Sequence, residues 1–157
     1  MLRRHFIINT ESSIPNDEIW YTSSNGNIVT PYSAEELPTI VSNVYSGGKG
    51  VIKFKKDITS IGSSAFGFRS SLTSVTIPNS VTILHQGAFQ DCSYLTYVRI
   101  SKNVRRISFR AFSNCVNLRN ILYENTIEQW GVVTKEDQWN VNVPATVVHC
   151  TDGDVEI

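Results

Sequence analysis

The sequence contains no long apolar run, and this shortage excludes the simplest kind of membrane protein. None of its apolar stretches approaches the roughly 20 residues that a transmembrane helix needs. Near the start, only Phe6, Ile7 and Ile8 form an apolar run, whereas a secretory signal needs about 7 to 15 apolar residues and a small-residue cleavage site. We therefore expect no membrane insertion. Either the protein is not exported, or an export segment has been removed from this chain.

Leucine is also scarce, while valine, isoleucine, threonine, serine and asparagine are plentiful. This bias disfavours a helical protein and favours strands and turns. Apolar residues make up 41% of the chain and charged residues 18%, which is a globular composition rather than a disordered one. A chain of 157 residues is most simply one domain.

Acidic residues are nearly absent from the middle of the chain, although the formal net charge is zero. Residues 49–119 carry a surplus of nine positive charges, and both flanks are acidic. Such a cluster either meets an anionic partner or keeps the surface soluble and neutralises the flanks. Nucleic-acid binding would need aromatic residues among the charges, and only Tyr97 qualifies, so we do not expect it. The cluster without any intervening acid comprises Arg99, Lys102, Arg105, Arg106, Arg110 and Arg119.

What the sequence does contain is a 23-residue repeat that runs without gaps. The pattern of GAFQDCSYLTYVRI at 87–100 recurs one period earlier, at 64–77, and one period later, at 110–123. A fixed self-similar period is the signature of a solenoid, in which equivalent side chains of successive turns stack. The columns are Ile58/Val81/Val104, Ile61/Leu84/Ile107, Ala65/Ala88/Ala111, Phe66/Phe89/Phe112, Arg69/Cys92/Cys115, Leu72/Leu95/Leu118, Val75/Val98/Ile121 and Ile77/Ile100/Tyr123.

Each unit predicts one strand and one short opposite edge. The alternation in LTSVTI is typical of a half-buried strand, and the apolar pair of VTIL precedes a turn back over the core. Neighbouring strands of this kind lie about 4.8 Å apart. Ile52 and Phe54 lie one period before Val75 and Ile77, so the strand part occurs four times. The fold class that we predict is a β-rich solenoid of parallel strands joined by short irregular or helical turns.

The phrases ITSIGSSAFGFRSSLTSVTIPNSVT, GAFQDCSYLTYVRI and RAFSNCVNLRNILY resemble the leucine-rich repeat of the BspA-like family of bacterial surface proteins. The resemblance covers residues 51–123, with departures at Phe68, Arg69, Leu84, His85 and Ser108 in the turns. It implies a leucine-rich-repeat solenoid and a non-enzymatic, adhesion-like module for protein-protein or host-surface recognition. It also implies a bacterial protein that is secreted or held at the cell surface.

The flanks are expected to cap the solenoid, because open ends would expose apolar cross-sections and strand edges. We predict one domain with an N-terminal cap at 1–48, repeats at 49–123 and a C-terminal cap at 124–157. Asn25-Gly26 indicates a hairpin, and the spacing over 34–45 allows a short helix limited by Pro38. Thr126 and Gln129 form a capping-box pattern that opens a helix, and TVVHC predicts a final strand. Trp130 and Trp139 are expected to cover the last turn.

The sequence offers little chemistry, and we expect no catalytic residue, cofactor or metal. Cys92 and Cys115 share a column, which favours buried thiols and leaves a disulfide or a metal ligand as alternatives. His149 and Cys150 are adjacent on a strand, so their side chains point to opposite faces and do not form a catalytic pair. The acidic residues of TDGDVE favour a solvated tail over a weak calcium site. We therefore do not expect a hydrolase, because the sequence contains no nucleophile with a base at an interpretable spacing.

If the protein binds a partner, we expect the outward side chains of the strands to do so, since stacked strands give a broad shallow surface. Tyr97 and Arg99 are the first candidates, because Tyr and Arg are enriched at binding hot spots. The partner would be a protein or glycan surface. The alternatives are a solvated sheet and a structural spacer from a longer array, and we expect a monomer. The candidate face consists of Lys53, Ser74, Thr76, Tyr97, Arg99, Asn120 and Leu122.

Overall fold

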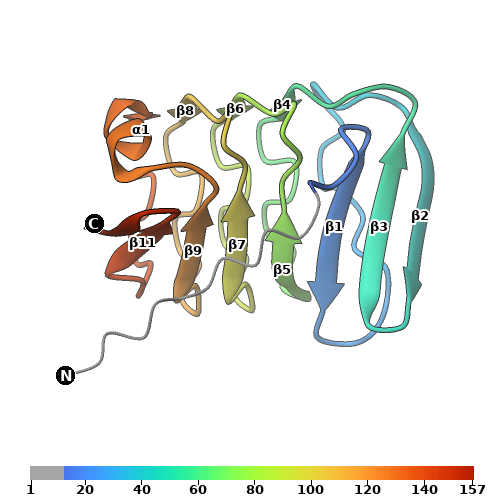
Figure 1. Ribbon diagram of the computed structural model, residues 1–157. Coiled ribbons are helices and arrows are strands. Elements are labelled where there is room, and N and C mark those ends of the chain that lie inside the picture. Colours follow the sequence, from blue (N-terminus) through green and yellow to red (C-terminus); the bar gives the residue numbers. More distant parts are fainter. Residues whose placement is uncertain (1–12) are drawn as a thin grey trace.

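A computed structural model describes residues 13–157, which form a solenoid with a β-sheet on two of its sides (Figure 1). The expectation about an export segment concerns residues 1–12, which lie outside the described part. The large sheet has eight strands in the order β12-β11-β9-β7-β5-β1-β3-β2, and the small sheet has the order β10-β8-β6-β4. The strands are β1 (Glu18–Ser23), β2 (Ile40–Ser46), β3 (Lys49–Phe54), β4 (Ser60–Ile61), β5 (Leu72–Thr76), β6 (Ile83–Leu84), β7 (Tyr97–Ile100), β8 (Arg106–Ile107), β9 (Asn120–Tyr123), β10 (Thr134–Lys135), β11 (Val147–Cys150) and β12 (Gly153–Glu156).

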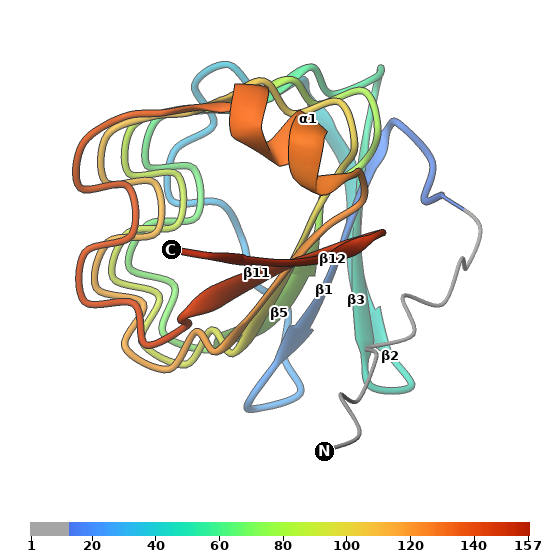
Figure 2. The same ribbon diagram turned by 60° about the vertical axis from the view of Figure 1, so that its left-hand side comes forward.

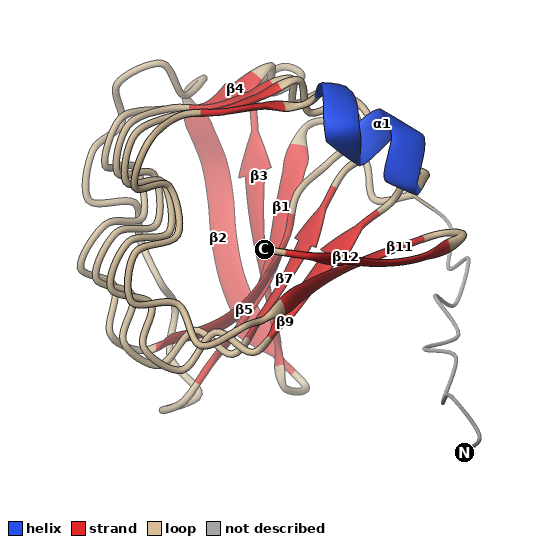
Figure 3. Cartoon of the chain, turned by 90° about the vertical axis from the view of Figure 1, so that its left-hand side faces the viewer, coloured by secondary structure: helices blue, strands red, loops and turns tan. Residues whose placement is uncertain are grey.

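The periodic columns of the sequence are confirmed as strand register. In the large sheet, the parallel strands β5, β7 and β9 place Val75 opposite Val98 and Val98 opposite Ile121. In the small sheet, β4, β6 and β8 are also parallel, with Leu84 opposite both Ile61 and Ile107. Figure 3 looks along the stack and shows the successive turns lying over one another. The sequence period therefore equals one full coil of the chain.

The phenylalanine column forms the centre of the core. The rings of Phe66 and Phe89 are stacked with centroids 5.5 Å apart, and those of Phe89 and Phe112 with centroids 5.2 Å apart. All three side chains are buried. A backbone ladder accompanies them, because the Phe66 amide donates to the Ala88 carbonyl and the Phe89 amide to the Ala111 carbonyl, both at 2.8 Å. Each coil is thus bound to the next on the turn side as well as in the sheets.

The turns between the two sheets repeat an unusual backbone conformation. Phe68, Asp91 and Asn114 occupy one column and have φ angles of 60°, 58° and 61°. Left-handed φ values are uncommon for side chains other than glycine, asparagine and aspartate. Asn142 has a φ of 60° as well, and its Nδ2 donates to Asn114 Oδ1 at 2.8 Å, so the C-terminal segment adds one more, slightly longer coil. The departure at Phe68 therefore leaves the turn geometry of its coil unchanged.

The N-terminal part differs from two sequence-based predictions. Asn25-Gly26 does not close a two-stranded hairpin. Instead β1 pairs antiparallel with both β3 and β5, and so lies between them in the sheet. The hairpin of this region is β2–β3, closed by Gly47 and Gly48 with φ of 58° and 79°. Two glycines at positive φ suit the tight two-residue turn that matches strand twist.

The predicted short helix at 34–45 is wrong, because β2 occupies the second half of that segment. Ile40, Val41 and Val44 have helix-like spacing, yet they lie on a strand paired with β3. The physical reason is non-local. The Gly47-Gly48 turn folds the segment back onto β3, where its backbone groups find partners, and a helix interrupted by Pro38 would be short.

The C-terminal part caps the solenoid as expected, with one addition. Helix α1 (Ile127–Val132) begins after Thr126, whose hydroxyl accepts the Gln129 amide at 3.2 Å. Trp130 and Trp139 are buried over the last coil, with Trp139 edge-on to Phe112 at 6.3 Å between centroids. Figure 2 shows α1 above the last strands.

The final strand is β12 rather than β11, so the acidic tail is paired in the sheet, while its acids Asp152, Asp154 and Glu156 are exposed as expected. β12 pairs antiparallel with β11 and forms one edge of the large sheet. Asp152, in the turn between them, accepts the Ile127 amide at 2.8 Å. An acidic side chain at a helix start satisfies a backbone amide that the helix leaves unpaired. No helix in residues 13–157 is long and apolar enough to cross a membrane.

Candidate functional site

The candidate site is the outer face of the large sheet, where alternate residues of the strands point away from the core. Ser74, Tyr97 and Asn120 lie in one row across β5, β7 and β9. Thr76 and Arg99 lie in the neighbouring row. These five residues of the candidate face are therefore neighbours on one surface, and they are half-buried. Their role in binding stays a prediction.

Lys53 comes one 23-residue period before Thr76 and was expected on the same face, but it does not lie beside Thr76. β1 separates β3 from β5, so the Cα of Lys53 faces that of Glu18 while Thr76 faces Trp20. The Lys53 ammonium lies 3.5 Å from Asp17 Oδ2 and 3.7 Å from Glu18 Oε1. The prediction assumed an uninterrupted parallel stack, and an antiparallel insertion cannot be detected from the period. Lys53, on β3, thus lies two strands away from Thr76 on β5.

Leu122 also departs from its predicted role. It is in register with Arg99 as expected, but it is only 4% exposed. A side chain with so little accessible surface offers a partner almost no contact area. The alternation of side chains along a strand predicted that Leu122 points away from the core. It could not predict that neighbouring parts of the chain cover this side chain. Leu122 therefore contributes to packing rather than to a surface.

Arg99 is held in place by an ion pair with Glu124. Its Nε donates to Glu124 Oε1 at 2.7 Å, and its Nη2 lies 2.5 Å from the same oxygen. The side chains are 14% and 18% exposed, so the pair is largely shielded from water. Charge-assisted hydrogen bonds in such places are stronger than exposed pairs. The arginine expected to contact a ligand is thus already partnered.

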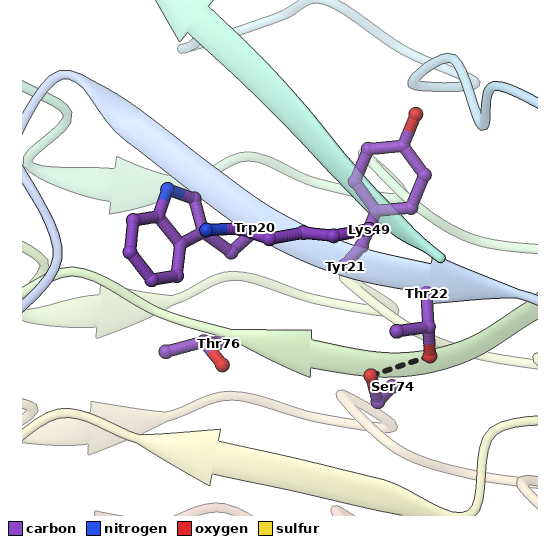
Figure 4. A pocket seen from close by; sticks show the side chains of 6 residues that line it. All are labelled: Trp20, Tyr21, Thr22, Lys49, Ser74 and Thr76. Atoms are coloured by element: carbon purple, nitrogen blue, oxygen red, sulfur yellow. Dashed lines mark hydrogen bonds between the residues drawn. The ribbon is translucent and has the colours of Figure 1, made fainter. Parts of the chain in front are cut away.

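The structure adds a small pocket beside these rows, which the sequence did not reveal. It has a volume of about 220 Å³ and lies where β1 is inserted next to β5 (Figure 4). The Lys49 ammonium lies 2.9 Å from the centroid of the Trp20 ring, a cation–π contact. Thr22 Oγ1 and Ser74 Oγ are hydrogen-bonded at 2.6 Å. The lining residues are Trp20, Tyr21, Thr22, Lys49, Ser74 and Thr76.

Trp20 differs from the other two tryptophans, and no sequence pattern indicated its place on this face. Trp130 and Trp139 are buried, whereas Trp20 is half-buried on the outer face, with its indole Nε1 donating to Glu18 Oε2 at 2.7 Å. An indole face, an ammonium and hydroxyls together can contact polar ligands with apolar faces.

The basic cluster does not act as one patch. Arg99 is paired on the large sheet, whereas Arg106, on β8 of the small sheet, lies with its Nε 3.6 Å from Glu136 Oε1. Arg105 donates to the carbonyls of Lys102 and Val104. These partners favour the interpretation that the charges neutralise acidic neighbours and satisfy local backbone groups.

The cysteines are buried thiols, as the column predicted. The Cys92 thiol donates to the Phe66 carbonyl and the Cys115 thiol to the Phe89 carbonyl, both at 3.0 Å. Hydrogen bonding to Cys92 and burial raise the pKa of the Cys115 thiol. Free Cys is among the most buried residue types, and a buried thiol of raised pKa is a poor nucleophile.

The His149 and Cys150 side chains do point to opposite faces of β11. The Cys150 side chain is buried, and burial raises the pKa of its thiol to about 11. On the other face, His149 Nδ1 lies 2.8 Å from Asp154 Oδ1. Across residues 13–157, no group of three or more His, Cys, Asp or Glu side chains is arranged to hold a metal ion.

The comparisons with known proteins agree with this architecture. The family model described as BspA type Leucine rich repeat region matches residues 12–134 in six copies. The chain belongs to this family of leucine-rich-repeat proteins. No curated protein matches the sequence.

Two solved structures are similar. One is a leucine rich cell surface protein of Faecalibacterium prausnitzii, with 35% identity over 52% of this chain and a TM-score of 0.50. The chain spans 22% of the length of that protein. The other is a leucine-rich repeat protein of Bacteroides capillosus, with a TM-score of 0.52 over 89% of this chain and 99% of the other. Its identity of 23% supports the shared fold alone.

Proposed function

We propose that this protein is a non-enzymatic recognition module that binds a protein or glycan through the outer face of the large sheet. The observation that carries the proposal is the pocket at β1 and β5, where Trp20, Lys49 and Ser74 supply an aromatic face, a positive charge and a hydroxyl. The rows that contain Tyr97 and Arg99 continue the same face across β7. Tyr, Trp and Arg are the side chains enriched at binding hot spots.

The proposed place of action is the bacterial cell surface. The similar protein of Faecalibacterium prausnitzii is described as a cell surface protein. We further propose the division into an N-terminal cap at 1–48, repeats at 49–123 and a C-terminal cap at 124–157. In this division the face spans the junction between the N-terminal cap and the first repeats, because Trp20 comes from the cap and Ser74 from the repeats.

The test is a binding screen against panels of immobilised glycans and extracellular proteins, followed by a matched pair of variants. Ser74→Lys places a long charged side chain in the middle of the face. Ser63→Lys makes the same change at an equally half-buried serine in a turn between the two sheets. Loss of binding in the first variant and retention in the second supports the proposal. Retention in both variants, with thermal melts unchanged, contradicts it.

The second proposal is a structural spacer within a longer repeat array, without a ligand of its own. It is favoured by the observation that the chain spans 22% of the similar cell surface protein. The same screen separates the two proposals. Binding to no member of either panel, at concentrations that detect millimolar affinity, favours the spacer. Binding that depends on Ser74 rules the spacer out.

A further inference from the structure

The edge strand β2 closes the large sheet at one end with little of the usual protection. Among the described residues it pairs only with β3, and it stands last in the strand order (Figure 1). Its sequence, IVSNVYS, includes neither a charge nor a proline, and the one irregularity in its register lies at its start, between Ile40 and Ser42. Val41 and Val44 are 62% and 57% exposed. Natural edge strands are normally short, charged, interrupted by proline or covered, so this one is a template for another strand.

The register of the β2–β3 hairpin determines which backbone groups of β2 face outward. Ser46 and Lys49 flank the two-residue turn, so they form a hydrogen-bonded pair, and such pairs recur at alternate residues. Ser42, Val44 and Ser46 therefore direct their N–H and C=O groups toward β3. The N–H and C=O groups of Asn43 and Tyr45 face the open edge of the sheet. Val41 lies in the register irregularity and has no partner on β3, so it stands outside this alternation.

The side chains along this edge are firmly held, which keeps the strand in position. Asn43 Oδ1 accepts the Tyr21 hydroxyl at 2.7 Å, and Asn43 Nδ2 donates to the Val29 carbonyl at 3.0 Å. The Tyr45 ring lies 6.0 Å from that of Tyr21. A strand fixed in this way loses little conformational freedom when another strand joins it.

The opposite edge of the large sheet, β12, is protected against pairing with a second copy, and in this it differs from β2. β12 carries the exposed acids Asp154 and Glu156, so two β12 strands brought together would oppose like charges. A β2 edge joined to a β12 edge would build an open filament, because such a contact is not self-complementary. Among the pairings of the two edges of the large sheet, as residues 13–157 form it, only β2 with β2 is both free of charge repulsion and closed by a two-fold axis.

We infer that β2 is a dimerisation edge, at which the β2 strands of two copies pair antiparallel about a two-fold axis at Val44. In this register Asn43 faces the partner's Tyr45, and Tyr45 faces the partner's Asn43. Each of these pairs exchanges two hydrogen bonds between the outward backbone groups. Val44, which is 57% exposed, packs against the partner's Val44 across the axis. The dimer replaces the monomer expected from the sequence.

Dimerisation joins the two large sheets into one continuous sheet. The two copies of Trp20 are then separated by five inter-strand spacings, or about 24 Å. If the proposed function holds, the dimer presents two binding faces side by side, and it binds a repetitive polymer more tightly than a single copy does. The dimer itself does not depend on that function.

The first test is sedimentation equilibrium of the full chain from about 10 μM to about 1 mM, because interfaces of this small size are weak. The wild type should show a monomer–dimer equilibrium. Val44→Lys should weaken self-association at least tenfold, because two lysines would then oppose each other across the axis. Val132→Lys is the matched control, because Val132 is 64% exposed on α1, and it should leave the equilibrium unchanged. A monomeric wild type at all concentrations, or dimers unaffected by Val44→Lys, overturns the inference.

The second test locates the contact by amide hydrogen exchange. Raising the protein concentration should slow exchange at the amides of Asn43 and Tyr45, while those of Ser42, Val44 and Ser46 are already protected by β3. Val44→Lys should abolish this concentration dependence. Concentration-dependent protection elsewhere, or unchanged protection in Val44→Lys, overturns the assignment to β2.

Discussion

The rings of Phe89 and Phe112 lie nearly parallel, with an interplanar angle of 4° and centroids 5.2 Å apart. Phe66 continues the stack on the other side of Phe89 at 5.5 Å and 7°. Phe89 is thus enclosed by the same side chain from the coils before and after it. No single coil buries its own phenylalanine, so stability depends on contacts between neighbouring coils.

Phe89→Ala should lower the free energy of unfolding by about 3 to 5 kcal/mol, because it leaves a cavity in the middle of the stack. Chemical denaturation measures the change. Phe68→Ala is the control, since Phe68 is 55% exposed and its loss should cost far less. A loss below about 1 kcal/mol for Phe89→Ala would contradict the role of the column as core.

Glu124→Gln should lower the free energy of unfolding by about 1 to 2 kcal/mol, because it removes the charge that Arg99 meets in a shielded site. The matched control is Glu136→Gln. Its partner Arg106 and Glu136 itself are 55% and 37% exposed, and such pairs contribute about 0 to 1 kcal/mol. Equal effects of the two variants would show that burial does not strengthen the Arg99 pair.

The stability of the protein should fall between pH 9 and pH 11, in part because of Cys150. Burial raises the pKa of its thiol from 9.0 to about 11, and Asp152 and Asp154 act in the same direction. The unfolded chain therefore loses this proton first as the pH rises. The stabilisation is complete below pH 9 and is lost on the way to pH 11, by up to about 2 kcal/mol.

Denaturation at several pH values checks this, with Cys150→Ala as the comparison. The variant should show a shallower fall over the same window, whatever its stability at neutral pH. Identical slopes for the variant and the wild type would show that the Cys150 thiol does not contribute.

Phe68→Asn should raise the free energy of unfolding by about 0.5 to 1 kcal/mol, because Phe68 has a φ of 60°, which is unfavourable for a bulky side chain and tolerated by asparagine. The later coils carry Asp91 and Asn114 at this position, and Asn114 Nδ2 donates to Asp91 Oδ1 at 2.9 Å. A thermal melt compares Phe68→Asn with Phe68→Ala, which keeps the strain. No gain over the alanine variant would contradict the argument.

The candidate site was predicted only in part, and the residues show why. Ser74, Thr76, Tyr97, Arg99 and Asn120 follow from the period and from strand alternation, both of which are local patterns. Trp20 and Lys49 reach the site because β1 enters the sheet beside β5, and the sequence contains no signal for that pairing. The burial of Leu122 depends equally on neighbours that are distant in sequence.

The amino-acid sequence by itself determined the repeating part of this protein. A gapless 23-residue period leaves one arrangement in which all apolar columns are buried together, and a capping pattern at Thr126 places the start of α1. Tertiary structure alone decided the ends. β1 is inserted antiparallel, β2 is a strand in spite of its helix-like spacing, and the acidic tail becomes β12. The physical reason is that a non-repeating segment has no neighbouring copy to fix its register. Its pairing therefore depends on which open sheet edge lies within its reach.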